Sequence, residues 1–365
     1  MSIDVWGSEP IKPMLAKAVA EIPADMAYEP KWDGFRCLVQ RIDDHVVLWS
    51  RGGKDLTVYF PELVEALTTA TPTRCLLDGE IVIITKDRLD FERLQERIHP
   101  AASRIAKLSV ERPAQFIAFD LLALGPDDLT AAPAAERRRA LERVLDVDQP
   151  SVHLTAQTLD IEVAKDWFVR FEGAGLDGVI AKPLDGTYQP DKRTMFKIKH
   201  KRTADVVVLG FRLHKNSTEE EPLLGSLQLG LYDEQGTCQF IGVASSFSTS
   251  KRAELATVLM EQEVRPGDSG FDDHPWAAAA SEMHDRRPGA ISRWSGSQGR
   301  VEQEGHLIMP LLVVEISFDY FEGTRLRHNG QVVRWRSDRD PESCTYDQIE
   351  VPQAIGITTV LDTTP

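Results

Sequence analysis

The segment Glu29-Pro30-Lys31-Trp32-Asp33-Gly34-Phe35-Arg36 decides how the first part of this chain is expected to fold. Pro30 and Gly34 bracket a tight turn, because proline fixes its own backbone and glycine adopts conformations that other residues avoid. The pattern Lys-x-Asp-Gly-x-Arg fixes four residue types, each at roughly 6% in average proteins, so a chance match is expected well under about once in a hundred such chains. The turn places Lys31 and Arg36 at the lip of a β-sheet, where a triphosphate could bind. Taken alone, a hairpin turn with exposed charges explains the segment equally well.

Strands and turns alternate around this segment. We expect strands at 27–30, 35–42 and 45–50, separated by turns at 31–34 and 43–44, which is typical of antiparallel β-structure. Further elements follow: β-rich runs at 75–84 and 115–124, and helices at 91–98, 134–145 and 161–172, the last ended by Gly173 and Gly175. The first domain, residues 1–201, is therefore predicted to be α+β with functional loops at strand ends.

Short strands with few helices follow residue 202. They are expected at 205–213, 225–232, 239–244, 307–318 and 332–335, with one helix at 250–264. Five strands and one helix fit a small oligonucleotide/oligosaccharide-binding barrel, the OB-fold, over residues 202–365. The stretch 266–303 is rich in Gly, Ser, Asp and Arg and too long for a simple turn, so we expect it to be mobile or functional.

The composition argues against several classes of protein. The chain starts without a signal peptide and has no run of about 18 apolar residues, so we expect a soluble, cytoplasmic protein with no membrane association. The four cysteines lie far apart with no Cys-x-x-Cys pair, which predicts reduced structural thiols rather than a zinc site or disulfides.

The net charge of −15 argues at first against a nucleic-acid partner. Residues 192–202, however, carry six formal positive charges and no acid. A second basic cluster comprises Arg325, Arg327, Arg334, Arg336 and Arg339, diluted only by Asp338. If both line one face, a phosphate-binding track can coexist with an acidic remainder; the alternative is that both are solvated faces of strands.

Six segments, in order along the chain, resemble the nucleotidyltransferase motifs of covalent ligases and capping enzymes. They are Lys31 to Arg36 (motif I), Leu77-Asp78-Gly79-Glu80 (motif III), Phe119-Asp120-Leu121-Leu122 (the adenine-stacking motif), Asp177 to Lys182 (motif IV), Lys197-Ile198-Lys199 (motif V) and Arg334 to Arg339 (motif VI). Their order and spacing are those of the family across almost the whole chain. Two positions depart from the usual pattern: Asp177 stands where Glu is usual, and Arg339 stands where Lys is usual.

The resemblance extends to the small ATP-dependent bacterial ligases of the ligase C and ligase D type. It rests on Pro13-Met14-Leu15-Ala16, on Glu29 to Arg36 and on the loop Pro288-Gly289…Ser292-Arg293-Trp294. Because the chain has no polymerase or nuclease region, the compact ligase C form is favoured. The resemblance implies an enzyme: an ATP-dependent DNA ligase that seals 3′-hydroxyl/5′-phosphate nicks in duplex DNA during repair or recombination.

The implied reaction starts with attack of Lys31 on the α-phosphorus of ATP, which forms a covalent lysyl-AMP and releases pyrophosphate. Because a free lysine is protonated at neutral pH, neighbouring cations have to favour loss of its proton. Lys182, Lys197, Lys199 and a bound Mg²⁺ or Mn²⁺ are expected to do this, with Lys197 and Lys199 at i and i+2 of one strand and hence on one face. Asp338 and Arg339 of the second domain are expected to orient the pyrophosphate, and that domain must then rotate away about a hinge near 201–204.

The resemblance also assigns the nucleotide and metal contacts. They are Glu29 for the adenine amino group, Phe119 for the adenine ring, Glu80 for the ribose hydroxyls, Arg36 and Arg51 for phosphate oxygens of AMP or the nick, and Asp33 and Asp177 for the metal. The ordinary alternatives are that Phe119 is a core residue and that Glu80 is a paired carboxylate.

Three rival functions are weighed against this prediction. They are an mRNA-capping type guanylyltransferase, an RNA ligase and a catalytically silent nucleic-acid clamp. Ser50-Arg51 and the ligase-like segment Arg334 to Arg339 count against the first, and the presence of Lys31 counts against the last. An NAD-dependent ligase is disfavoured because the chain has neither zinc-binding cysteines nor extra modules. The expected partner is nicked duplex DNA, bound by a monomer; the sequence identifies no repair-protein partner.

Overall fold

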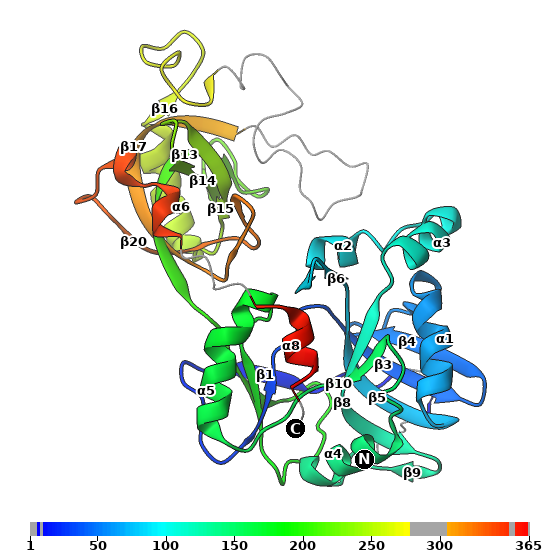
Figure 1. Cartoon of the computed structure of the whole chain (residues 1–365). Helices are drawn as coiled ribbons and strands as arrows, with labels where there is room; N and C mark the ends of the chain where they lie inside the picture. The colour runs from blue at the N-terminus through cyan, green and yellow to red at the C-terminus, as the bar shows by residue number, and fades with distance from the viewer. Residues whose placement is uncertain (1–5, 8–9, 278–304, 350–354, 364–365) are drawn as a thin grey trace. The chain divides into compact units, whose positions relative to one another are not determined.

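The computed structural model describes residues 6–7, 10–277, 305–349 and 355–363 and divides the chain into two compact units (Figure 1). The first unit comprises Met1–His200 and Pro352–Pro365, and the second comprises Lys201–Val351. The division differs from the expected second domain 202–365, because the C-terminal segment groups with the first unit. Its helix α8 (Ile357–Leu361) buries Ile357 and Val360 in a core cluster of that unit.

Two sheets form the centre of the first unit. The six-stranded sheet has the order β10-β8-β5-β3-β4, with β9 paired to β8, and the four-stranded sheet has the order β1-β12-β11-β2. The strands are β1 (Leu15–Ala18), β2 (Ala27–Pro30), β3 (Phe35–Ile42), β4 (His45–Ser50), β5 (Arg74–Val82), β8 (Gln115–Leu124), β9 (Asp127–Asp128), β10 (Val152–Leu154), β11 (Val179–Lys182) and β12 (Arg193–Ile198). A separate hairpin pairs β6 (Ile84–Thr85) with β7 (Arg88–Leu89). All pairings are antiparallel except β10 with β8 and β1 with β12.

Residues 31–34 do not form a hairpin, so the alternative explanation of this segment as a hairpin turn is excluded. Strand β2 pairs with β11, whereas β3 pairs with β4 and β5, so residues 31–34 cross from one sheet to the other. Gly34 is required by close approach, since a Cβ there would lie 2.1 Å from the carbonyl oxygen of Ile81. The turn at 43–44 is a hairpin as expected, with Ile42 opposite His45 and Asp43 at a φ of 54°.

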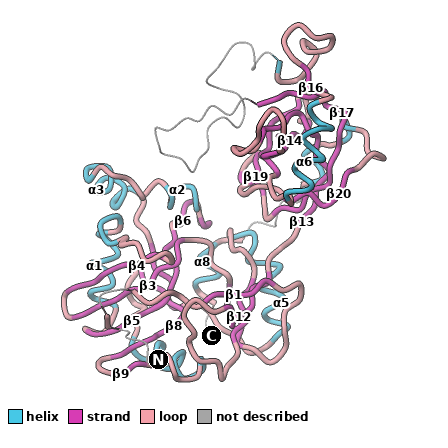
Figure 2. The backbone as a smooth tube through the Cα atoms, turned by 180° about the vertical axis from the view of Figure 1, so that it is seen from behind, coloured by secondary structure: helices cyan, strands magenta, loops and turns pink. Residues whose placement is uncertain are grey.

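Helices cover the outer faces of both sheets (Figures 1 and 2). Helix α1 (Pro61–Ala70) contacts β4 and α3 (Ala102–Glu111), α4 (Ala134–Val144) contacts β8, and α5 (Ile161–Arg170) contacts β2 and β11. The helices expected at 91–98, 134–145 and 161–172 are confirmed as α2 (Phe91–Gln95), α4 and α5. After α5 a 3₁₀ turn, η2 (Phe171–Ala174), ends at Gly175, whose φ of 90° is the left-handed cap that the sequence predicted.

One antiparallel sheet, whose strands differ in length, dominates the second unit. Its order is β15-β14-β13-β17-β16, with β20 also paired to β17. The elements are β13 (Arg202–Leu213), β14 (Leu224–Tyr232), β15 (Cys238–Ala244), α6 (Thr249–Met260), β16 (Glu263–Val264), β17 (Gly305–Phe318), β18 (Phe321–Glu322), β19 (Arg325–Leu326) and β20 (Gln331–Trp335). The five strands and the helix expected here are present, but the OB-fold is not confirmed. Within 201–277 and 305–349 the outer strands β15 and β16 are not paired to each other, so the sheet does not close into a barrel.

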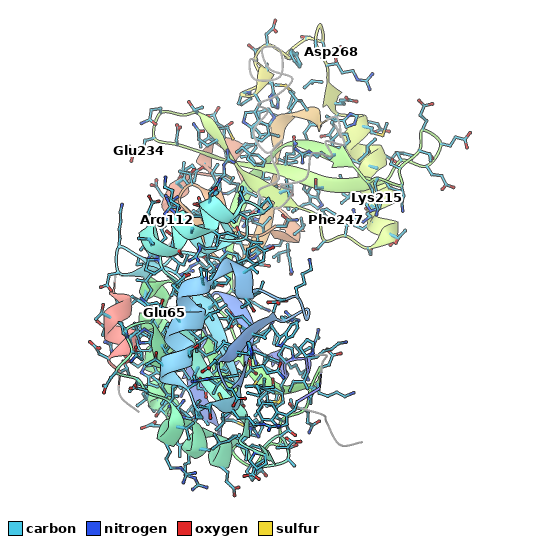
Figure 3. All side chains as sticks on the ribbon, turned by 90° about the vertical axis from the view of Figure 1, so that its right-hand side faces the viewer. Glu65, Arg112, Lys215, Glu234, Phe247 and Asp268 are labelled. Carbon is cyan, nitrogen blue, oxygen red and sulfur yellow. The ribbon has the colours of Figure 1, made fainter. Side chains whose placement is uncertain are left out.

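The first part of the long loop expected at 266–303 contributes side chains to the core of the second unit. Phe271 and Trp276 are buried in the main cluster of the second unit, and the Trp276 indole donates to the carbonyl of Cys238 at 2.9 Å. The expected motif Pro288-Gly289…Ser292-Arg293-Trp294 lies outside the described residues. Figure 3 shows Lys215, Glu234 and Asp268 exposed in the loops after β13, β14 and β16.

The four cysteines, Cys37, Cys75, Cys238 and Cys344, are buried and free, as expected for structural thiols. Burial raises the pKa of Cys75 to about 11 and that of Cys238 to about 12, so neither thiol ionises at neutral pH. In the described part of the chain, no helix combines the length and the apolar character that crossing a bilayer requires.

Candidate active site

Lys31 is fixed beside the segment that carries Asp177 by two main-chain hydrogen bonds. The Lys31 amide donates to the carbonyl of Gly178 at 2.8 Å, and the Asp177 amide donates to the carbonyl of Lys31 at 2.9 Å. Gly178 has a φ of 119°, and a Cβ there would lie 2.0 Å from the carbonyl oxygen of Ile198. Motifs I, IV and V therefore meet at one point, where only glycine allows their backbones to approach so closely.

A cluster of lysines surrounds one carboxylate at this point. Nζ of Lys31 lies 2.6 Å from Oδ2 of Asp177, and Nζ of Lys199 lies 2.7 Å from the same oxygen. Burial raises the pKa of Asp177, but the two ammonium groups outweigh it and lower that pKa below its ordinary value. Asp177 is therefore an anion that holds both amines.

Lys197 lies in the field of the same cluster. Burial, followed by Lys199 and Lys31, lowers the pKa of Lys197, while Asp177 raises it. Arg51, exposed directly after β4, also lowers that pKa. Strand β12 ends at Ile198, so Lys199 lies one residue beyond the strand on which it was expected.

Arg36 is engaged by a residue that sequence reasoning missed. Its Nε lies 2.5 Å from Oδ1 of Asp78, and its Nη2 lies 2.7 Å from Oδ2. Burial alone lowers the pKa of Arg36, but Asp78 raises it well above its ordinary value. The hydroxyl of Tyr188 donates to the same carboxylate at 2.6 Å, so Asp78 anchors two side chains. The only sequence signal for Asp78 was its place beside Glu80 in motif III.

Glu29, Lys182 and Phe119 meet on the other side of this region. Nζ of Lys182 lies 2.7 Å from Oε2 of Glu29, and the two side chains are 6% and 3% exposed. Gln157, which the sequence did not single out, donates to Oε1 of Glu29 at 2.9 Å. Lys182 also donates to the Phe119 carbonyl at 3.1 Å.

The Phe119 ring is half-buried rather than a core residue, and two cations lie over it. Cζ of Arg36 is 4.5 Å and Nζ of Lys182 is 4.9 Å from its centroid. A pocket beside the ring is lined by Ala27, Glu29, Phe119, Asp120, Ala134, Ala135, Arg138, Gln157, Lys182 and Leu184. An aromatic face next to buried polar groups is typical of pockets that bind small molecules.

Glu80 accepts a hydrogen bond from the amide of Gly34 at 3.2 Å, which ties motif III to motif I. Burial raises the pKa of Glu80 to about 7, although Arg36 and Lys31 counteract this rise. A carboxyl group that is part protonated at neutral pH and lies near the Lys31 and Arg36 cations is a candidate for a functional contact.

The residues expected to bind metal fit a magnesium ion that arrives with a triphosphate. Among the described residues no group of three or more His, Cys, Asp and Glu side chains is placed to hold a metal ion. Mg²⁺ is commonly held by one or two carboxylates together with substrate phosphates. Asp177, already an acceptor for two cations, is suited to that use, and half-buried Asp33 lies in the adjoining motif.

Motif VI forms its own ion-pair network in the second unit. Nη1 of Arg336 lies 3.0 and 2.9 Å from the two carboxylate oxygens of Asp205, and its Nε lies 2.9 Å from Asp338. Arg336 lowers the pKa of Asp338 to about 2. Nε of Arg339 lies 3.7 Å from Asp205, and its Nη2 donates to the carbonyl of Ser343 at 3.2 Å. Asp205, not singled out from sequence, thus connects the expected residues of this motif.

Family comparisons agree with the class of enzyme that this geometry indicates. A family model described as "ATP dependent DNA ligase domain" matches residues 11–199, which is more than half of the chain, and one described as "ATP dependent DNA ligase C terminal region" matches residues 220–339. Together with a lysine held among further lysines at the meeting of three motifs, these matches define the class. The chain belongs to the ATP-dependent DNA ligase family.

Within that family the chain is similar to ligases of the C type. It is 51% identical to DNA ligase C2 of Mycolicibacterium smegmatis over 347 residues, and this match covers 94% of this chain and 95% of the relative. It is 49% identical over 359 residues to DNA ligase C of Mycobacterium tuberculosis, covering 96% and 97%. The ligase C resemblance expected from the motifs is therefore confirmed.

Solved structures agree on the fold. A structure of a Lig E DNA ligase superposes with a TM-score of 0.54 at 16% identity and covers 89% of this chain and 99% of its own. At that identity the likeness shows the fold alone.

Proposed function

We propose that this enzyme seals nicks in duplex DNA through a covalent AMP on Lys31. The observation that carries the proposal is the position of Lys31, whose amine lies 2.6 Å from Asp177 while Lys199 contacts the same carboxylate oxygen. An amine held in a cluster of cations is suited to attack a phosphorus atom, because the cations also neutralise the reacting phosphate.

In the first step the Lys31 nitrogen forms a bond to the α-phosphorus of ATP, and the bond from that phosphorus to the bridging oxygen breaks to release pyrophosphate. The Lys31 ammonium must first release one proton to solvent, so its pairing with Asp177 has to loosen when the triphosphate binds, and the nitrogen releases a second proton to solvent as its bond to phosphorus forms. Lys197 and Lys199 then stabilise charge on the phosphate oxygens. A bound Mg²⁺, held by Asp177 and Asp33, would neutralise further phosphate charge.

The remaining contacts follow from the side chains around this cluster. Phe119 offers its ring to the adenine, Glu29 accepts from the adenine amino group and Glu80 binds the ribose hydroxyls. In the later steps AMP passes to the 5′-phosphate of the nick and the 3′-hydroxyl displaces it, so positioning dominates. Arg51, exposed beside the cluster, and Nη1 of Arg36, whose other nitrogens contact Asp78, are the proposed ligands of the 5′-phosphate or of AMP.

We assign the adenylation domain to residues 1–201 together with the C-terminal helix α8 that packs in its core, and an OB-type domain to the chain between them. Asp338 and Arg339 are the proposed groups that orient pyrophosphate during the first step, with a hinge near residues 201–204 that lets the second domain leave before DNA binds. A monomeric cytoplasmic enzyme acting in DNA repair is the cellular setting we propose.

Label transfer from α-labelled ATP tests the nucleophile. Lys31→Ala should accept no label yet still seal a nick that already carries AMP, because the later steps do not use the lysine nitrogen as nucleophile. Lys54→Ala, which changes an exposed lysine, should label as wild type does. Labelling of Lys31→Ala at the wild-type level, or an adduct on another side chain, rules out the proposal.

A further inference from the structure

Arg138 is a buried cation that lines the pocket beside the Phe119 ring. It lies on α4, which packs against β8 (Figure 1), and its side chain is only 5% exposed. Its Nε donates to Oε1 of Glu142 at 2.6 Å. Its two terminal nitrogens, Nη1 and Nη2, are buried and have no hydrogen-bond partner among the residues that the structure describes.

Buried guanidinium N–H groups almost always have acceptors, because leaving them unpaired costs the whole desolvation penalty of a charged donor. Arg137, the preceding residue, illustrates the satisfied state, with two contacts to Asp120 at 2.8 and 3.0 Å. Arg138 instead lines the pocket that also contains Glu29, Gln157 and Phe119. The unpaired donors therefore indicate an acceptor atom on whatever molecule fills this pocket.

The other polar groups of the pocket narrow the identity of that molecule. Glu29 is an acceptor whose two oxygens are oriented by Lys182 and Gln157, and the Phe119 ring supplies a flat apolar face. Adenine matches this set because its amino group donates hydrogen bonds and the ring nitrogens on either side of it, N1 and N7, accept them. In guanine an oxygen replaces that amino group and would face the Glu29 carboxylate.

We propose that Arg138 donates to a ring nitrogen of adenine beside the amino group that Glu29 accepts, and so helps to select ATP. This inference rests on the proposed function, since it places the adenine of ATP against Phe119. Gln157 acts as a positioning residue, because its amide and the Lys182 ammonium fix the Glu29 carboxylate.

Labelling of Lys31 in the full-length enzyme, measured against nucleotide concentration, tests the proposal. Arg138→Gln should raise the ATP concentration for half-maximal labelling about tenfold or more, with little change in the maximal rate, because the lost contact is to the base and not to the reacting phosphate. Arg139→Gln, at an exposed neighbouring position on α4, should leave both values unchanged.

Two ATP analogues identify the acceptor atom. With 1-deaza-ATP or 7-deaza-ATP, each of which replaces one ring nitrogen by carbon, one analogue should weaken binding to wild type by the same factor as Arg138→Gln weakens binding of ATP. That analogue and ATP should then bind equally to Arg138→Gln. If wild type binds both analogues as it binds ATP, or if a folded Arg138→Gln labels normally, Arg138 contacts only water and the proposal is wrong.

The design separates this proposal from the function on which it rests. If wild type takes up no label from ATP, the proposed function itself fails. If wild type is labelled and the analogue results are negative, only the inference about Arg138 fails. Should Arg138→Gln unfold, the analogue measurements on wild type still decide the question without it.

Discussion

The buried pair of Glu29 and Lys182 provides the sharpest test of how this site is held together. Replacing Lys182 with Met removes the ammonium group and keeps a side chain of similar length. The Glu29 carboxylate then stays buried, with Gln157 as its remaining donor. An ionised carboxylate without its cation is unstable in such surroundings, so Lys182→Met should lower the free energy of unfolding.

The size of the effect follows from the burial of the pair. Both side chains are almost fully buried, at 6% and 3% exposure, and the charged atoms are 2.7 Å apart. Removing one partner of such a pair costs about 3 to 5 kcal/mol. Because Gln157 continues to donate to Glu29, we expect the lower end, about 3 kcal/mol, which is a large share of the about 5 to 15 kcal/mol that stabilises a typical protein.

Urea unfolding of a double-mutant cycle measures this value. Glu29→Gln should also cost about 3 kcal/mol, since it leaves the buried Lys182 ammonium without an anionic partner. The double variant Glu29→Gln/Lys182→Met should cost no more than either single variant, which is a coupling of about 3 kcal/mol.

An exposed pair provides the matched control. Lys165 and Glu162 are 54% and 73% exposed at 2.7 Å, and Lys165→Met should change the free energy of unfolding by about 0.5 kcal/mol or less. Strictly additive effects in the Glu29/Lys182 cycle, or a Lys182→Met cost no larger than that of Lys165→Met, would refute the reasoning.

Two further predictions concern the same unit. Burial raises the pKa of Glu80 to about 7 from an ordinary value of 4.5, so the native state keeps a proton that the unfolded chain has lost between these values. Stability should therefore fall as the pH rises from 4.5 to about 7, and urea unfolding across this range should show a smaller fall in Glu80→Gln. Ile357→Asp, which places a charge at a position 1% exposed in the α8 contact, should cost about 3 kcal/mol or more in thermal unfolding, whereas Thr359→Asp on the exposed side should be nearly neutral. An Ile357→Asp variant as stable as Thr359→Asp would show that α8 does not support the unit.

The bounds of strands were predictable where the apolar pattern and the turn residues of the segment itself determine them. The strands expected at 27–30, 35–42, 45–50 and 115–124 have the same bounds as β2, β3, β4 and β8. The partners of these strands were not predictable in the same way. Whether β2 pairs with β3 or with β11 depends on contacts between residues about 150 positions apart, which no local pattern records.

The candidate site shows the same limit. Motif residues such as Lys31 and Asp177 were identified because their types recur in a fixed order, and the structure brings both together with Lys199. Gln157 and Arg138 were missed because they stand in ordinary-looking segments, and their significance lies in what surrounds them. A buried donor without an acceptor is visible only after the chain has folded.

The C-terminal helix α8 supports the backbone that positions Asp177, although it lies far from Asp177 in sequence. Asp87 accepts hydrogen bonds from both the amide and the hydroxyl of Thr358, at 3.1 and 2.7 Å. A Cβ on Gly356 would lie 1.9 Å from the Asp87 carboxylate, so the start of α8 packs closely against Asp87. Helix α8 then packs on η2, and η2 leads through Gly175 directly to Asp177. The carboxylate that pairs with Lys31 is thus supported by residues from the C-terminal helix. Because the support acts on the backbone that positions Asp177 and not on the lysine itself, weakening α8 should lower stability and the rate of Lys31 labelling together.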